Sequence, residues 1–177
     1  MTTSGRENQI SERIAIVSDT HAQISPDVLA VVESCSMVVH AGDICGKNVL
    51  DLLHASSKVV VAVRGNNDVQ DLWANNEADT VNALPRVAEL QLPGGKLVVE
   101  HGHLHGMISP DHNKLRMAHP QANMIVYGHT HKRIIDKSAS PWVVNPGAAG
   151  NVRNGGGPCC LVLEASEQSW AIKEFQF

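Results

Sequence analysis

The chain has 177 residues, of which 43% are hydrophobic, 3% aromatic and 18% charged, and its formal net charge at pH 7 is -4. This length suits one domain with a sizeable core, and the hydrophobic content excludes a disordered chain. The scarcity of aromatic residues and the negative charge argue against nucleic acid as a partner, because nucleic-acid binders stack bases on aromatic rings and neutralise phosphates with Lys and Arg.

Nothing in the sequence indicates export or a membrane. Residues 1–12 are mostly polar and lack the apolar segment of a secretory signal, and the longest apolar runs, such as residues 59–63, are far shorter than a membrane span. None of the four cysteines belongs to a C-x-x-C pair, and we interpret them as reduced thiols. We therefore expect a polar tail over residues 1–12, a single domain over residues 13–177 and a cytoplasmic location.

The first half of the chain alternates short apolar strands with helices. Strands are predicted at residues 14–17, 37–40 and 58–63, and helices at residues 26–34 and 47–55. Each of these strands is nearly all apolar and runs into a polar loop. Such strands indicate a sheet that is covered on both faces, and ligands collect at the carboxyl ends of its strands.

The second half is richer in strands. Pro93-Gly94-Gly95 separates two strand segments and predicts a hairpin over residues 86–100. A helix is predicted at residues 111–119, and further strands are predicted at residues 124–127, 133–136, 142–145, 159–164 and 170–177. The expected fold class is α/β, with two sheets packed together and helices outside.

Side chains that can bind metal follow five of these predicted strands. They are Asp19, His21, Asp43, Asn66, His101, His129 and His131. Each motif alone has a structural interpretation as a capped loop, a helix N-cap, a turn or a backbone-bonded histidine. Together they offer oxygen and nitrogen ligands without thiolates, a set that suits Mn²⁺, iron, Zn²⁺, Co²⁺ or Ni²⁺. Seven ligands exceed what one ion can use, and two ions that share a bridging carboxylate account for them economically.

The motifs and their order resemble those of the calcineurin-like metallophosphoesterases. The motifs are Asp19-x-His21, Gly42-Asp43, Gly65-Asn66-x-Asp68, His101-Gly102-His103 and Gly128-His129-x-His131. The small size and the His-Gly-His form resemble the compact prokaryotic phosphodiesterase branch of the family, from about Arg13 to the C terminus. The resemblance implies a four-layer αββα sandwich, in which two mixed β-sheets are flanked by helices.

The resemblance also implies a ligand set for each of two divalent ions. One ion would be bound by Asp19, His21 and His131, and the other by Asn66, His101 and His129. Asp43 would bridge the two. Mn²⁺ is the metal that we expect first, with iron, Zn²⁺, Ni²⁺ and Co²⁺ as alternatives.

The residue after the motif Asn departs from the family pattern. Many family members have a His there that helps to protonate the leaving group, whereas this chain has Asn67. An amide cannot act as a general acid near neutral pH. His103 is the nearest substitute, and a purely hydrogen-bonding role for His103 stays open.

The expected function is hydrolysis of a small phosphodiester by in-line attack of a hydroxide that bridges the two ions. Asp43 and His103 are the expected catalytic residues. A phosphomonoesterase or phosphoprotein phosphatase is the first alternative. The second is a non-catalytic scaffold like the retromer subunit that resembles this branch. A homo-oligomer is expected from the resemblance alone.

Several residues outside the motifs also receive an interpretation. Arg64 and Arg153 are candidate phosphate contacts, and the segment that begins at Asn145 is interpreted as structural support. His40 is expected to be buried behind the motif loops. The helical histidines are expected to be exposed, namely His54, His112 and His119.

Overall fold

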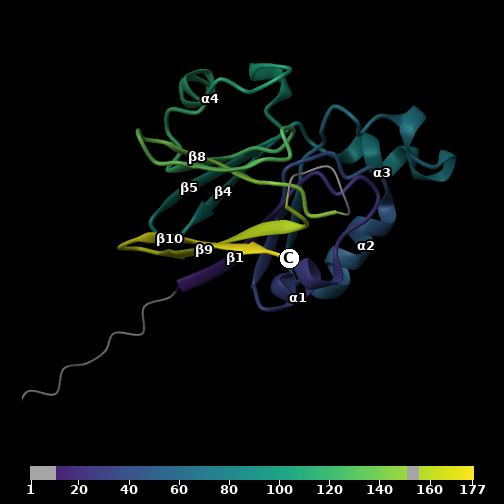
Figure 1. The fold of residues 1–177 in the computed structure, drawn as a ribbon, viewed down its shortest axis with the longest axis horizontal. Helices are drawn as coiled ribbons and strands as arrows, with labels where there is room; N and C mark the ends of the chain where they lie inside the picture. Colours follow the sequence, from purple (N-terminus) through teal and green to yellow (C-terminus); the bar gives the residue numbers. More distant parts are fainter. Residues whose placement is uncertain (1–10, 151–155) are drawn as a thin grey trace, which may run out of the picture.

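Two five-stranded sheets pack face to face (Figure 1) within the described part of the chain, residues 11–150 and 156–177 of the computed structural model. The first sheet has the order β10-β9-β1-β2-β3 and the second has the order β4-β5-β6-β8-β7. The strands of the first sheet are β1 (Ser11–Val17), β2 (Met37–His40), β3 (Val60–Ala62), β9 (Cys159–Ser166) and β10 (Trp170–Gln176). Those of the second are β4 (Val87–Leu92), β5 (Gly95–Glu100), β6 (Met124–Val126), β7 (Arg133–Asp136) and β8 (Trp142–Pro146).

Both sheets are mixed, as expected. In the first, β2 pairs in parallel with β1 and β3, while β9 pairs antiparallel with β1 and β10. In the second, β6 pairs in parallel with β5 and β8, and the two outer strands are antiparallel to their neighbours. The parallel strands of each sheet therefore end at one edge, where the predicted ligands follow them.

The apolar run of β1 is explained by burial on both of its faces. Ile14 and Ile16 belong to the core between the two sheets, which also contains Leu97 and Val126 of the second sheet. Because successive side chains of a strand alternate in direction, the residues between them belong to the core beneath the helices. Such a strand reads as continuously hydrophobic rather than alternating.

Helices cover the outer faces of both sheets (Figure 1). On the first sheet lie α1 (Pro26–Glu33) and α2 (Lys47–Ser56), and on the second lies α4 (His112–Ala118), while α3 (Ala78–Ala83) adds Val81 to the core beneath α1 and α2. The Ser25 hydroxyl accepts the Asp27 backbone N–H and caps α1, which begins with a proline as predicted. The four layers of the αββα sandwich are thus confirmed.

The structure differs from the sequence prediction in three places. Strand β1 begins at Ser11, so Ser11 and Glu12, which were expected in the tail, pair with β9. Between β3 and β4 the chain forms α3 and the short 3₁₀ helices η1 (Gln70–Leu72) and η2 (Asn75–Glu77), none of which was predicted. A third 3₁₀ helix is η3 (His103–His105). No helix in the described residues is long and apolar enough to cross a membrane.

Candidate metal centre

The predicted ligands meet where the carboxyl ends of strands from both sheets come together. Asp19 and His21 follow β1, Asp43 follows β2 and Asn66 follows β3, all in the first sheet. His101 follows β5 in the second sheet, and His129 and His131 follow β6. The centre therefore spans the two sheets, and neither sheet alone provides the full ligand set.

The loops that carry these residues have unusual backbone angles. Seven non-glycine residues in the described ranges have positive φ, and five of them are predicted ligands: Asp19, His21, Asp43, His129 and His131. Side chains other than glycine rarely adopt this conformation, and strained residues of this kind cluster at functional sites. Strain is thus concentrated where the sequence places its metal ligands.

Two glycines let the motif loops approach one another. A Cβ on Gly42, which has φ +94°, would lie 2.7 Å from both the Gly65 backbone nitrogen and His101 Nδ1. A Cβ on Gly65 would collide with the Asp43 carboxylate. Glycine at these positions therefore allows the loops after β2, β3 and β5 to pack against each other.

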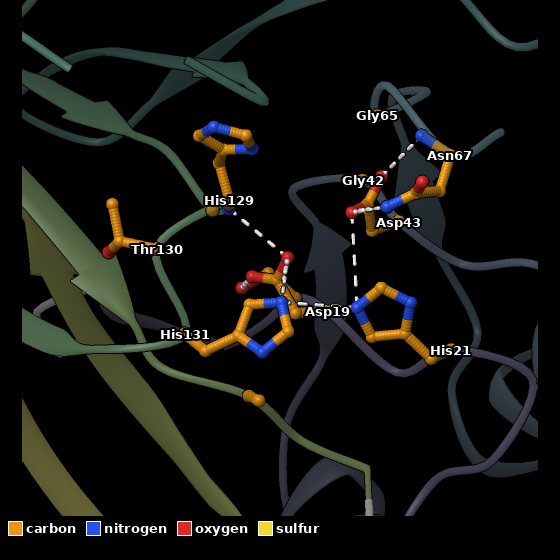
Figure 2. Close-up of polar contacts among 12 residues, drawn as sticks. Asp19, His21, Gly42, Asp43, Gly65, Asn67, His129, Thr130 and His131 are labelled. Carbon is orange, nitrogen blue, oxygen red and sulfur yellow. Dashed lines mark hydrogen bonds and ion pairs between the residues drawn. The ribbon is translucent and has the colours of Figure 1, made fainter. Parts of the chain in front are cut away.

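Four side chains form a first group that can hold one metal ion: Asp19, His21, Asp43 and His131 (Figure 2). Each offers a ligand atom, and these atoms all lie within 4.8 Å of one another. His21 Nε2 lies 3.1 Å from His131 Nε2, which lies 3.4 Å from Asp19 Oδ1. Two ligands about 2.1 Å from one ion lie about 3.0–3.4 Å apart in tetrahedral to octahedral geometry, so these separations fit a single cation.

A second group lies on the other side of Asp43. His101 Nε2 is 3.1 Å from Asn66 Oδ1 and 3.4 Å from Asp43 Oδ1. The Ala41 carbonyl can only accept, so His101 Nδ1 donates to it at 2.8 Å. Burial acts to lower the pKa of His101, but the hydrogen bond and charge of Asp43 outweigh it and raise that pKa. Nε2 therefore donates toward Asp43 in the metal-free protein, and a cation placed between Nε2, Asn66 Oδ1 and Asp43 Oδ1 would replace this proton.

His129 contacts the first group through its backbone and the second group through its ring. Its backbone N–H donates to Asp19 Oδ1 at 3.1 Å, and Figure 2 shows its ring turned away from that carboxylate. The ring packs edge-on against His101 with centroids 5.2 Å apart. Nε2 of His129 donates to the Met107 carbonyl at 2.7 Å, which leaves Nδ1 as the lone-pair nitrogen. Metal-binding histidines commonly donate their other N–H to a backbone carbonyl, as His101 and His129 both do here.

The two buried carboxylates of the centre differ in pKa. Burial raises the pKa of Asp19 to about 7, although His101 and the Ser18 hydroxyl partly oppose this shift. Burial also acts to raise the pKa of Asp43, but hydrogen bonds from His101 and Asn67 outweigh it and hold the pKa well below its ordinary value. Asp43 is therefore ionised at neutral pH even without a metal. Asp19 is only partly ionised there, and a bound cation would favour its charged form.

Asp68 is a positioning residue whose role the motif alone did not reveal. This buried carboxylate accepts the backbone N–H groups of Ile44 (3.0 Å), Cys45 (2.8 Å) and Gly65 (2.7 Å). It also accepts from Trp73 Nε1 at 3.2 Å. Asp68 thus ties the loop of Asp43 to the loop of Asn66. The sequence shows only an aspartate at the end of a turn-like segment. This pattern does not distinguish a residue that links two loops from an ordinary capped turn.

His103, the expected proton donor, lies beside the second group. Its ring centroid is 5.4 Å from that of His101, and its Nδ1 is buried without a hydrogen-bond partner in the described structure. Burial and the nearby rings of His101 and His129 lower the pKa of His103. The ring is therefore neutral at pH 7 and offers one N–H rather than an imidazolium.

Two interpretations of the remaining residues agree with the structure. His40 is fully buried, and burial lowers its pKa to about 3. Its Nδ1 accepts the Gly42 N–H, and its Nε2 lies 3.0 Å from Thr20 Oγ1. Asn145 donates to the Gly128 carbonyl at 2.6 Å and supports the loop of His129 and His131. Arg153 lies outside the described residues.

Two of the helical histidines are not free on the surface, contrary to expectation. His112 Nδ1 lies 2.6 Å from Asp136 and its Nε2 lies 3.0 Å from the Tyr127 hydroxyl. His119 contacts Glu100 at 2.8 Å. Both rings are half-buried because α4 packs against the second sheet, whereas His54 on α2 is exposed as predicted.

Comparisons with known proteins agree with this geometry. A sequence model described as the calcineurin-like phosphoesterase superfamily domain matches residues 13–168. A probable metallophosphoesterase of Methanocaldococcus jannaschii is 30% identical over 144 residues, which cover 76% of this chain and 67% of the relative. A phosphodiesterase of the same organism is 24% identical over 144 residues, covering 76% of this chain and 82% of that protein.

A solved structure with a similar fold is wild-type Vps29 of Entamoeba histolytica in complex with Zn²⁺. It superposes with a TM-score of 0.68 at 20% sequence identity, covering 93% of this chain and 98% of that chain. At this identity the likeness concerns the fold, and it supports the two-sheet architecture described above.

Proposed function

This chain belongs to the calcineurin-like phosphoesterase superfamily, and we propose that it is a metal-dependent phosphodiesterase acting on small phosphodiesters. The observation that carries the proposal is the convergence of Asp19, His21, Asp43 and His131 within 4.8 Å. A cluster of carboxylates and imidazoles is a ligand set for hard or borderline divalent ions.

We propose that this first group holds one ion and that His101, Asn66 and His129 hold a second. Asp43 lies between them, with Oδ2 3.9 Å from His21 Nε2 and Oδ1 3.4 Å from His101 Nε2. Bound divalent ions would act as Lewis acids that polarise the phosphoryl oxygens and lower the pKa of water. Mn²⁺ is our first choice for both positions.

The protein's own residues prepare the centre for this chemistry. Asn67 and His101 keep Asp43 ionised, and the Ala41 and Met107 carbonyls orient the rings of His101 and His129. His103 contributes a hydrogen bond toward the substrate from a neutral ring. Because Asn67 cannot donate a proton to a departing alkoxide, the site favours esters whose leaving group departs as a stable anion.

The proposal is tested by removing metal with a chelator, reloading with Mn²⁺, Zn²⁺, Co²⁺, Ni²⁺ or Fe²⁺, and assaying bis(p-nitrophenyl) phosphate and p-nitrophenyl phosphate. We expect metal-dependent turnover that favours the diester. His131→Ala should abolish most of it, while His54→Ala, which removes an exposed histidine, should not.

Two results would overturn this function. Faster cleavage of the monoester would indicate a phosphomonoesterase. A folded protein without turnover on either ester, whatever the metal, would indicate a non-catalytic scaffold.

A further inference from the structure

A polar cavity adjoins the metal centre on the side of the second group. Its volume is about 440 Å³, and it is lined by residues of the loop after β3, by η1 and α3, and by Arg86 and His103. Of the predicted metal ligands only Asn66 borders it. Cavities that hold small-molecule ligands have volumes of about 300–1,000 Å³, so this one has room for a group beyond the phosphoryl that the metals would hold.

The two arginines of this cavity differ from the other arginines of the described chain. Arg13, Arg116 and Arg133 each form a salt bridge, to Glu164, Asp136 and Glu174 respectively. Arg64 and Arg86 line the cavity, and neither guanidinium has an ion pair or hydrogen bond with any described residue. A guanidinium offers five N–H donors in a planar fork that matches a carboxylate or a phosphate.

The backbone brings these two arginines near each other. The Arg64 N–H donates to the Pro85 carbonyl at 2.9 Å, which places the residue before Arg86 against the loop that follows β3. His103 also lines this cavity.

The two aspartates of the lining balance the formal charge of the two arginines, but neither forms an ion pair with a guanidinium in the described residues. The Asp68 carboxylate is already occupied by three backbone N–H groups and the Trp73 indole. Asp71 is exposed on η1, where water solvates its carboxylate. Asn82 and Gln70 complete the wall with neutral amides.

We propose that this cavity binds an anionic group, a phosphate or a carboxylate, on the ester arm of the substrate that is not being displaced. The substrate class is thus a phosphodiester with a second negative charge on one substituent. The inference rests on the proposed phosphodiesterase function for its catalytic test, and direct binding provides a test that is independent of turnover.

The catalytic test uses three diesters with the same p-nitrophenyl leaving group, so that water displaces nitrophenolate from phosphorus in each. The second arm is ethyl, 2-carboxyethyl or 2-phosphoethyl. For the metal-loaded protein we expect kcat/KM to be about tenfold higher or more for an anionic arm than for the ethyl arm. The anionic arm that is preferred identifies carboxylate or phosphate as the ligand.

The variants are Arg64→Gln and Arg86→Gln, with Arg13→Gln as a control that removes the same charge from β1, away from the cavity. Each cavity variant should lower the preference for the anionic arm by about tenfold, with the larger part of the loss in KM. Arg13→Gln should keep the preference. Equal kcat/KM for all three esters, or an equal loss in all three arginine variants, would overturn the proposal.

The binding test uses chelator-treated protein and inorganic pyrophosphate, followed by isothermal titration calorimetry. We expect binding that Arg86→Gln weakens about tenfold and Arg13→Gln does not. If no ester is cleaved but pyrophosphate binds in this pattern, the phosphodiesterase function fails and the anion site stands. If esters are cleaved without discrimination and pyrophosphate does not bind, the anion site fails and the phosphodiesterase function stands.

Discussion

Asn67 donates a hydrogen bond to each oxygen of the Asp43 carboxylate. Its backbone nitrogen lies 2.9 Å from Oδ1 and its side-chain amide nitrogen lies 2.7 Å from Oδ2 (Figure 2). In this chain, the position at which many relatives are expected to carry a proton-donating histidine instead stabilises the central anion of the centre. The side chain at position 67 therefore points toward Asp43, between the two groups.

Asn67→His should change which esters are cleaved. An imidazolium at this position can protonate a departing alkoxide, and general acid catalysis contributes about 10²–10⁴-fold. We expect a large gain in kcat for diesters with alkyl leaving groups and a small one for nitrophenyl esters, which need little protonation. The measurement is kcat against leaving-group pKa for both proteins.

Asn67→Ala is the control, because it removes the contact with Asp43 without adding a proton donor. A flat dependence of kcat on leaving-group pKa in the wild-type protein would contradict the prediction. His103→Ala would then be the next variant to examine.

Asp43→Asn should lower metal content more than any other ligand change. Asp43 lies between His21 of the first group and His101 of the second, and the substitution removes the negative charge that its hydrogen bonds maintain. We expect less than one ion per chain by inductively coupled plasma mass spectrometry and a loss of activity by orders of magnitude. Asp51→Asn on the exposed face of α2 is the control, since its pair with Lys47 is worth only about 0.3–0.5 kcal/mol. A variant that keeps two ions and normal turnover would show that Asp43 does not bridge.

Asp68→Asn should destabilise the fold and the centre together. The amide NH₂ would face N–H donors that now donate to a carboxylate, and a buried polar group left without a partner costs about 1–3 kcal/mol. We expect the free energy of unfolding in urea to fall by about 2–4 kcal/mol, with weaker metal binding. Asp79→Asn, an exposed change on α3, should cost little. Unchanged stability in Asp68→Asn would mean that its backbone contacts do not hold the two loops.

His40 should make the metal-free protein less stable in acid. Its pKa is about 3 in the folded protein and near 6.5 when unfolded. Its contribution is therefore fully present above pH 6.5 and is lost as the pH falls toward 3, with a slope of up to about 1.4 kcal/mol per pH unit. The raised pKa of Asp19 acts in the opposite sense, because its contribution falls as the pH rises from 3.8 to about 7.

The informative quantity is thus the difference between the wild-type protein and His40→Gln. Urea unfolding of the chelator-treated proteins at about pH 7.5 and about pH 5 should show a smaller loss of stability on acidification in the variant. Equal losses in the two proteins would mean that His40 is not protonated on unfolding.

Most strands were predictable because their signal is local. Residues 14–17 and 37–39 are apolar throughout, since both of their faces are buried, and each run ends near the start of a polar loop. The short helices between β3 and β4 were not predictable. In α3 only Val81 is buried, and six residues are too few for a helical period to stand out.

Long-range pairing was invisible in the sequence. The sequence around His112 and His119 does not reveal their partners. Asp136 and Glu100 lie on other elements and meet these histidines only when α4 packs on the second sheet. The sequence likewise did not predict that Arg64 and Arg86 would line the same cavity. Among the described residues neither guanidinium has a partner, and this is a property of the folded chain.

The sequence by itself determined which types of metal ligand this protein offers. Oxygen and nitrogen donors at the ends of apolar strands select divalent metals, whatever the exact path of the chain. Only the tertiary structure decided that His21 and His131, which are 110 residues apart, face each other at 3.1 Å. It also decided that Asn67 donates hydrogen bonds to Asp43 and that Asp68 links the loops after β2 and β3. The physical reason is that residue type and strand position are local properties, whereas distances between loops depend on how two sheets pack across a shared core.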